Sequence, residues 1–158
     1  MKKIITALCA IISISIFTAG CTNDDKSISS TRNLQQEESN KQLVLKFYQR
    51  LFGDKDISAI DEYIVTNYIQ HNPQVADGRE ALKTMAAQWI AGGPKTTVDV
   101  RKSIAEGNLV ILHVKSPTPD GKYQAIVEIF RVENNQIVEH WDVIQAAPET
   151  SANPHPMF

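Results

Sequence analysis

Charged and polar residues interrupt two strongly apolar segments near the end of this 158-residue chain. The stretch AIVEIFRVENNQIVEHWDVIQ, residues 125–145, contains Glu128, His140, Trp141 and Asp142 among Val, Ile and Phe. Because an isolated buried charge is costly, ionisable groups on core-forming segments predict a pocket with a polar floor. A carboxylate in such a pocket can act as a general base. The alternative is that these side chains lie on a solvated face of a sheet.

The two apolar segments predict a β-hairpin. They flank Glu133-Asn134-Asn135-Gln136, and Asn tolerates the positive φ that a tight hairpin turn requires. Alternation sorts the polar residues of the second strand into two sets, His140 with Asp142 and Trp141 with Gln145. The sequence leaves open which set shares a face with Glu128, because a bulge would exchange them.

The residues before this hairpin predict helices followed by strands. The first expected helix begins near Glu37 and ends at Gly53, and a shorter helix capped by Asp56 follows and includes Ile64. A loop or short extended segment is expected at 68–73, and then a third helix capped by Asp77. Strands are expected near 98–101 and 109–114. Helices followed by an antiparallel meander indicate an α+β fold. A curved sheet closed by helices forms a cone with an internal cavity, which suits a small molecule.

The first 20 residues predict a signal peptide. Lys2 and Lys3 precede an apolar run at 4–17 that is too short for a permanent membrane span, and small residues follow it. Thr-Ala-Gly-Cys resembles the lipobox of bacterial lipoproteins, so we expect export, lipidation of Cys21 and anchoring at the bacterial envelope. Thr22 is not the Asp that often retains such lipoproteins at the inner membrane, so the expected destination is the outer membrane where the source has one. The alternative is an ordinary secretory signal, cleaved near the same point.

The remaining chain divides into a tether, a domain and a tail. We expect residues 21–39 to form the anchor cysteine and a flexible polar tether, residues 40–149 one domain, and residues 150–158 a Pro-rich tail. Once Cys9 has left with the signal, Cys21 has no partner for an intramolecular disulfide. The chain has 16 basic and 18 acidic residues and no basic cluster with interleaved aromatic residues, which argues against nucleic-acid binding.

Two motifs resemble a known family. YIQHNPQVADGREAL and, later in the chain, IFRVENNQIVEHWDVIQ are similar to the SnoaL-like branch of the nuclear transport factor 2-like superfamily. The resemblance covers residues 40–149 and implies a cone made of a strongly curved antiparallel sheet wrapped by about three helices. Relatives include polyketide cyclases that catalyse an intramolecular aldol condensation and, more distantly, ketosteroid isomerase and limonene-epoxide hydrolase. The superfamily also contains non-catalytic proteins, so the fold alone does not establish an activity.

The resemblance implies a set of site residues. Glu128 stands where the cyclases have a catalytic carboxylate, usually Asp, and is the expected base. His71, in the QHNP motif, matches a position at the pocket mouth and is expected to donate a proton or hydrogen bond to an enolate. His113 completes the expected catalytic set. The expected substrate-binding residues are Tyr68, Asn72, Trp89, His140, Trp141, Asp142 and Gln145.

Each main candidate has a structural alternative. Glu128 could instead form an ion pair with Arg131 or Lys122, and His71 could order the loop at Asn72. His113 and Trp89 could be core residues, and Trp141 could be a dimer contact. No metal or cofactor is expected, because local ligand spacing and a Gly-rich phosphate loop are both missing from the sequence.

Two hypotheses of function follow. The first is a cofactor-free lyase, isomerase or cyclase that acts on a small apolar carbonyl compound. The second is a non-catalytic module of the cell envelope that binds a small ligand or a partner. We also expect a homodimer formed through the convex face of the sheet, since exposed apolar patches mark interfaces and two-fold pairing is the commonest closed assembly.

Overall fold

The computed structural model of the protein describes residues 32–158. The expected signal peptide, Cys21 and most of the expected tether lie outside the described residues. Within the described part of the chain, no helix is long and apolar enough to cross a bilayer.

Helix α1 spans Leu34–Tyr48 and begins inside the segment expected to be a tether. The side chain of Asn33 caps its first turn by accepting a backbone N–H hydrogen bond. Glu37 is buried, and its carboxylate accepts hydrogen bonds from Arg32 and from the N–H of Gly107. The folded domain therefore begins before residue 40, because local hydrogen bonds and a long-range one from Gly107 order a polar sequence that has no apolar period.

A π-helical segment, Gln49–Gly53, continues α1, and helix α2 follows at Ser58–Tyr63. Asp56 was predicted to cap this helix, but the N-cap position is Ile57; Asp56 Oδ1 accepts the N–H of Ser58 at 3.0 Å from one residue further back. Ile64 was expected on the apolar face of this helix, and that prediction was wrong. Ile64 instead begins strand β1, Ile64–Gln70, because pairing with β5 buries this β-branched side chain completely.

Helix α3 spans Arg79–Ile90. Asp77 was predicted to cap it, but Asp77 Oδ1 accepts the N–H of Gln70 at 2.8 Å and so ties the loop to the end of β1. The position before the helix is occupied by Gly78 with φ of 95°, a backbone conformation that glycine adopts without strain.

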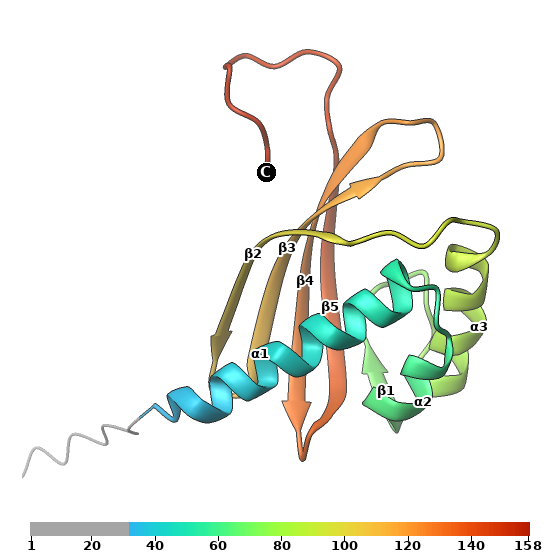
Figure 1. The fold of residues 1–158 in the computed structure, drawn as a ribbon, viewed down its shortest axis with the longest axis vertical. Helices are drawn as coiled ribbons and strands as arrows, with labels where there is room; N and C mark the ends of the chain where they lie inside the picture. Colours follow the sequence, from blue (N-terminus) through green and yellow to red (C-terminus); the bar gives the residue numbers. More distant parts are fainter. Residues whose placement is uncertain (1–31) are drawn as a thin grey trace, which may run out of the picture. The chain divides into compact units, whose positions relative to one another are not determined.

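The sheet has five strands in the order β1-β5-β4-β3-β2 (Figure 1). The last four strands are β2 Asp99–Glu106, β3 Leu109–Pro117, β4 Tyr123–Glu133 and β5 Gln136–Ala146. They pair antiparallel, whereas β1 runs parallel to β5. Asn134 and Asn135 have φ of 49° and 59°, which confirms the predicted hairpin turn.

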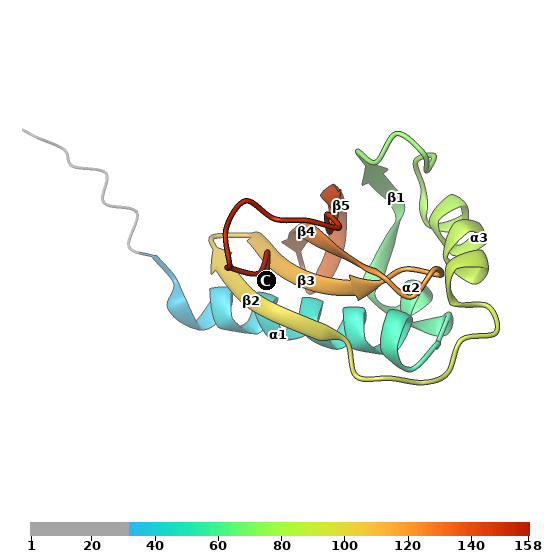
Figure 2. The ribbon, with the colours of Figure 1, turned by 90° about the horizontal axis from the view of Figure 1, so that it is seen from above.

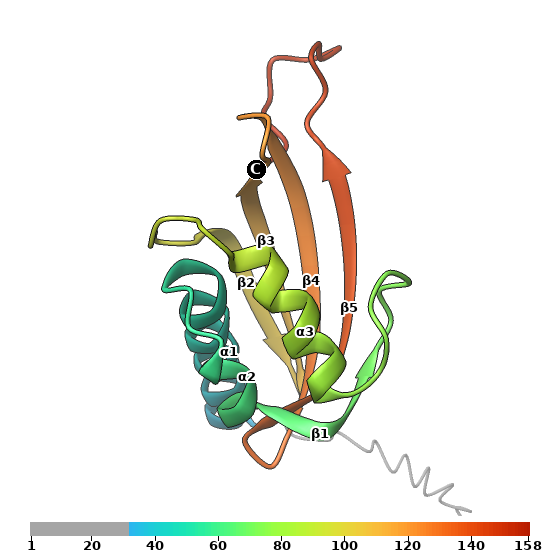
Figure 3. The ribbon, with the colours of Figure 1, turned by 90° about the vertical axis from the view of Figure 1, so that its right-hand side faces the viewer.

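All three α-helices lie on the same side of the curved sheet, with α1 crossing the strands and α2 and α3 beside β1 (Figures 1 and 3). Side chains that alternate along β3 and β4 face α1 and form the core with it. The largest fully buried side chains are Val44, Leu51, Ile60, Ile64, Tyr68, Val110, Leu112 and Ile137. The α+β prediction is confirmed, and the open cone places the inner face of β4 and β5 beneath the helices.

The C-terminal segment after β5 folds back over the outer face of the sheet, near β2 and β3 (Figure 2). The ring of Phe158 lies 6.4 Å from the imidazole of His113 and 5.2 Å from the ammonium group of Lys115. The tail therefore contacts the face opposite the helices.

Candidate functional site

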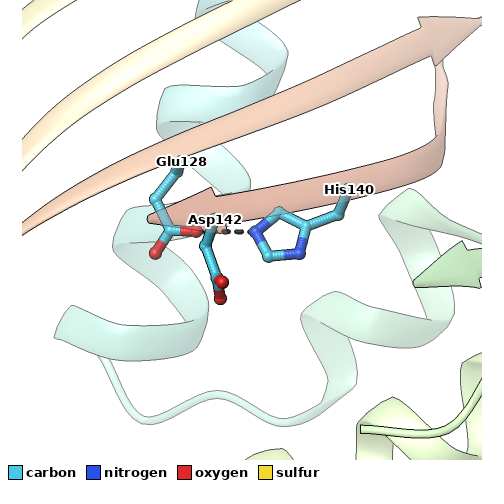
Figure 4. Close-up of side chains that lie close together, drawn as sticks. All are labelled: Glu128, His140 and Asp142. Atoms are coloured by element: carbon cyan, nitrogen blue, oxygen red, sulfur yellow. Dashed lines mark hydrogen bonds and ion pairs between the residues drawn. The ribbon is translucent and has the colours of Figure 1, made fainter. Parts of the chain in front are cut away.

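The register of the β4–β5 hairpin decides which polar residues face the helices. Glu128 pairs with Asp142 and Phe130 with His140, and the register shifts by one residue between Arg131 and Val132. Residues that oppose each other in antiparallel strands project on the same face. The side chains of Glu128, His140 and Asp142 therefore converge on the inner face (Figure 4).

These three side chains form the floor of a pocket between the sheet and the helices. Its open space amounts to about 60 Å³. The lining residues are Phe47, Tyr48, Leu51, Phe52, Tyr68, Gln70, Asn72, Val75, Leu82, Trp89, Glu128, Phe130, His140 and Asp142. Apolar and aromatic walls around a few convergent polar groups are typical of small-molecule sites.

Glu128 and His140 form a closely paired, buried acid–base couple. Glu128 Oε2 lies 2.6 Å from His140 Nε2, and Glu128 Oε1 accepts a hydrogen bond from the Tyr48 hydroxyl at 2.9 Å. A carboxylate oxygen and an imidazole nitrogen at 2.6 Å must share a proton, because two lone pairs would otherwise face each other. With Nδ1 of His140 also protonated, the pair as a whole is neutral wherever the shared proton resides, and without that second proton it carries one negative charge.

Asp142 has a different environment. Its Oδ2 accepts a hydrogen bond from Asn72 Nδ2 at 2.6 Å. Among the described residues, no group donates to its other carboxylate oxygen, and this oxygen is not sealed from solvent. Asp142 is half-buried, so it presents an unoccupied acceptor to the pocket.

Two tyrosines supply hydroxyl groups at this floor. Burial raises the pKa of Tyr48 well above its usual value, and the nearby Glu128 carboxylate raises it further. Burial, with the charges of Glu128 and Asp142, also raises the pKa of Tyr68. Both phenols therefore remain protonated at neutral pH. Tyr48 donates to Glu128, whereas the Tyr68 hydroxyl accepts from Gln70 Nε2 at 3.4 Å and keeps its own proton free to donate.

Glu128, His140 and Asp142 could also supply metal ligands, since one ligand atom from each lies within 4.8 Å of the others. The hydrogen bonds argue for protons instead. A cation bound there would displace the proton between Glu128 and His140. The arrangement therefore fits proton transfer better than metal coordination.

Six of the ten predicted catalytic and substrate-binding residues line the pocket, namely Tyr68, Asn72, Trp89, Glu128, His140 and Asp142. Trp89 was also considered a core residue, but it is 46% exposed and its ring stacks on that of Phe52, 6.4 Å between ring centres. This pair of aromatic residues lies where the pocket wall meets solvent.

The other four predicted residues are not among those that line this pocket. The imidazole of His71 stacks on the ring of Trp141 at 4.6 Å, and its Nε2 lies 2.8 Å from Glu139 Oε1. Trp141 pairs with Ile129 and so projects from the outer face. His113 lies beside the tail on that face, and Gln145 is exposed near the end of β5.

Sequence reasoning missed Tyr48 and Gln70 as site residues. Tyr48 belongs to the apolar stripe of α1, so its pattern indicated only core. Gln70 lies in the same QHN segment that drew attention to His71 and Asn72, and its Oε1 lies 2.9 Å from His140 Nδ1. Its position next to His71 and Asn72 was the signal in the sequence that could have identified Gln70 as a site residue.

Comparisons with known proteins agree with this architecture. A family model described as SnoaL-like polyketide cyclase matches residues 42–150. No curated protein matches the chain.

Solved structures share the fold at low sequence identity. An NTF2-like protein of unknown function from Burkholderia xenovorans is 21% identical over 75% of this chain and 91% of its own, with a TM-score of 0.62. One from Mesorhizobium loti is 22% identical over 70% and 93%, with a TM-score of 0.59. An epoxide hydrolase of the LEH-like type from M. tuberculosis is 14% identical over 70% and 85%, with a TM-score of 0.57.

Proposed function

We propose that this chain, which belongs to the SnoaL-like polyketide cyclase family, is a cofactor-free lyase, isomerase or cyclase that moves protons on a small apolar carbonyl compound. The observation that carries the proposal is the hydrogen-bonded Glu128–His140 couple beside the carboxylate oxygen of Asp142 that has no donor among the described residues, at the floor of an apolar pocket. Groups that can accept and return protons at one place are the requirement of general acid–base catalysis.

Asp142 is the base in this proposal. A base needs a lone pair that can reach a substrate proton, and Asp142 has a carboxylate oxygen without a donor among the described residues. Both oxygens of Glu128 are already engaged, one by the Tyr48 hydroxyl that donates to it and the other in the contact with His140. This assignment replaces the sequence-based expectation that Glu128 is the base.

The proposed step breaks the C–H bond next to the substrate carbonyl. The proton passes to Asp142, and the electron pair of the bond forms an enolate whose charge develops on the carbonyl oxygen. The hydroxyl of Tyr68, which keeps its proton, is placed to donate to that oxygen. Return of the proton to a different carbon gives isomerisation. Attack of the enolate carbon on a second carbonyl gives an alkoxide, which takes the proton back from Asp142 to become the aldol product.

The test is exchange of carbon-bound hydrogen. Small cyclic and aliphatic ketones are incubated with the protein in D₂O, and loss of the proton signal next to the carbonyl is followed by NMR. We expect acceleration by the wild-type protein and a loss of about 10²–10⁴-fold in Asp142→Asn, the size of a general-base contribution. Equal exchange rates for the two proteins, or no exchange with any ketone, would contradict the proposal.

A second candidate is a non-catalytic ligand-binding module of the cell envelope. The small open volume of about 60 Å³ favours it, because side chains already fill most of the pocket. A larger ligand requires displacement of a wall residue such as the exposed Trp89. Saturable binding of a ketone without hydrogen exchange would support this second function.

We further propose export of the protein and its attachment to the envelope through lipidated Cys21, which would place the domain outside the cytoplasm. The support is the order of basic, apolar and small residues that ends in cysteine.

We also propose a homodimer through the outer face of the sheet. The exposed apolar side chains Ile104, Leu109, Tyr123 and Val143 on β2 to β5 support it.

A further inference from the structure

The loop that follows β1 orients two amide side chains by means of its own backbone. The N–H of Asn72 donates to Gln70 Oε1 at 2.9 Å, and the N–H of Gln74 donates to Asn72 Oδ1 at 2.9 Å. A backbone N–H can only donate, so the amide atom facing it must be oxygen in both cases. The identities of the oxygen and nitrogen atoms in these two amides are therefore settled by the backbone.

The orientation of Gln70 has a consequence for His140. Gln70 Oε1 lies 2.9 Å from His140 Nδ1, and an oxygen without a hydrogen can only accept. His140 must therefore carry a proton on Nδ1 and direct Nε2 toward Glu128. A hydrogen bond of 2.9 Å from the N–H of His71 to the carbonyl of His140 holds the same loop against β5.

The orientation of Asn72 gives Asp142 a hydrogen-bond donor, whereas Gln70 gives His140 an acceptor. Since Asn72 Oδ1 is engaged by the backbone, its Nδ2 faces Asp142 Oδ2 and donates to it at 2.6 Å. That contact requires an acceptor oxygen, and so it favours the ionised carboxylate. One loop thus offers an acceptor to the histidine and a donor to the acid.

We propose that Gln70 and Asn72 are positioning residues that set the protonation states of the pocket, with Nδ1 of His140 protonated and Asp142 ionised. The titratable groups that surround Asp142 are Glu128 on β4, His140 on β5, Tyr48 on α1 and Tyr68 on β1. Glu128 and His140 are neutral as a pair and the tyrosines are protonated, so Asn72 is the residue that supplies Asp142 with a donor. The effect on turnover rests on the proposed function, whereas the protonation states do not.

Asn72→Asp tests the role of the Asn72 amide as a donor to Asp142, because it replaces the amide nitrogen with an oxygen and keeps the shape of the side chain. The new carboxylate still offers an oxygen to the N–H of Gln74, but it places a second oxygen against Asp142 Oδ2, and two carboxylates at this distance must share a proton. Gln74→Glu is the matched control, because it adds the same charge to the same loop at an exposed position.

The readout is ¹³C NMR of aspartate carboxyl groups over a pH series, with the Asp142 signal assigned from Asp142→Asn. We expect its titration midpoint to move up by about one pH unit or more in Asn72→Asp and to stay within a few tenths in Gln74→Glu. An unchanged Asp142 signal in Asn72→Asp, in a variant whose circular dichroism matches the wild type, would overturn the role of Asn72.

Gln70 is tested through the ring nitrogens of His140 by ¹⁵N NMR. We expect the wild type to show a protonated Nδ1, Gln70→Leu to lose this preference, and Gln70→Glu to restore it because the carboxylate still accepts. A wild-type His140 with unprotonated Nδ1, or a Gln70→Leu spectrum like that of the wild type, would overturn the role of Gln70. If these signals behave as expected and no ketone exchanges hydrogen, the proposed function fails while this inference stands.

Discussion

Glu128 on β4 and Asp142 on β5 lie directly opposite each other in the hairpin, and both carboxylates enter the same pocket. Two like charges in one partly buried site would repel strongly. The proton shared by Glu128 and His140 removes one of these charges, and the amide of Asn72 stabilises the other. The pocket therefore combines one neutral couple that holds a proton with one carboxylate that can accept one.

The two carboxylates differ in their expected contribution to catalysis. We expect Asp142→Asn to lower kcat/KM for hydrogen exchange by about 10²–10⁴-fold, and Glu128→Gln to lower it by less, because Gln keeps the shape of a residue that is not the base. Steady-state kinetics of both variants decide the order. A larger loss in Glu128→Gln would return the role of base to Glu128.

The buried tyrosines predict a late alkaline transition. The raised pKa values of Tyr48 and Tyr68 mean that their protonated forms stabilise the folded state fully below the unfolded pKa of about 10. That stability is lost as the pH rises from about 10 toward the folded values. Absorbance at the phenolate band should show part of the tyrosine signal appearing only with unfolding. Tyr48→Phe and Tyr68→Phe should each reduce this late component, and a signal that titrates completely while the protein is folded would contradict the prediction.

Glu37 predicts a pH-dependent stabilisation at the start of α1. Its hydrogen bonds with Arg32 and the N–H of Gly107 hold its pKa below the usual value, so the stabilisation is present above the unfolded pKa and is lost as the pH falls through the folded one. We expect Glu37→Gln to lower Tm at pH 7 and to leave it nearly unchanged in strong acid. Glu38→Gln is the control, since the exposed pair of Glu38 with Lys41 is screened by water and contributes little. Equal effects of the two substitutions at neutral pH would remove the special role of Glu37.

Processing at Cys21 is expected to leave a lipid-modified mature protein. Mass spectrometry of protein expressed in a bacterial host should show a chain that begins at Cys21 and carries added acyl mass. Cys21→Ser should yield an unmodified form that no longer partitions with membranes. An unmodified wild-type chain that begins elsewhere would contradict the lipid anchor while leaving simple secretion open.

The outer face of the sheet is expected to mediate pairing of two copies. Val143 is 63% exposed on that face, so Val143→Arg should not disturb the core but should place a charge in the proposed interface. Sedimentation of the domain at tens of micromolar should show a dimer for the wild type and a shift to monomer for this variant. Gln88→Arg, at an exposed position of α3, should remain dimeric. A wild-type protein that is monomeric under these conditions would contradict the prediction.

Features that depend on residues close together in the chain could be predicted from the sequence alone. The Asn134–Asn135 turn depends on neighbouring residues and was predicted correctly, and so was the run of antiparallel strands in the last part of the chain, although strand β1 comes before helix α3. The same local pattern identified Glu128, His140 and Asp142 as polar residues on apolar strands. Residue type and spacing therefore determined the fold class and the chemical character of the site.

Only the tertiary structure decided which of these residues meet. Counting back from the hairpin turn would place Trp141 opposite Glu128, but the shift in register between Arg131 and Val132 places Asp142 there instead. Tyr48 reaches Glu128 across 80 positions of sequence, and Asn72 reaches Asp142 across 70. His71 and Asn72 are adjacent, yet His71 stacks on Trp141 of the outer face while Asn72 lines the pocket. Such contacts depend on a bulge and on long-range packing, and because a one-residue change of register moves every side chain of a strand to the other face, no local pattern determines them.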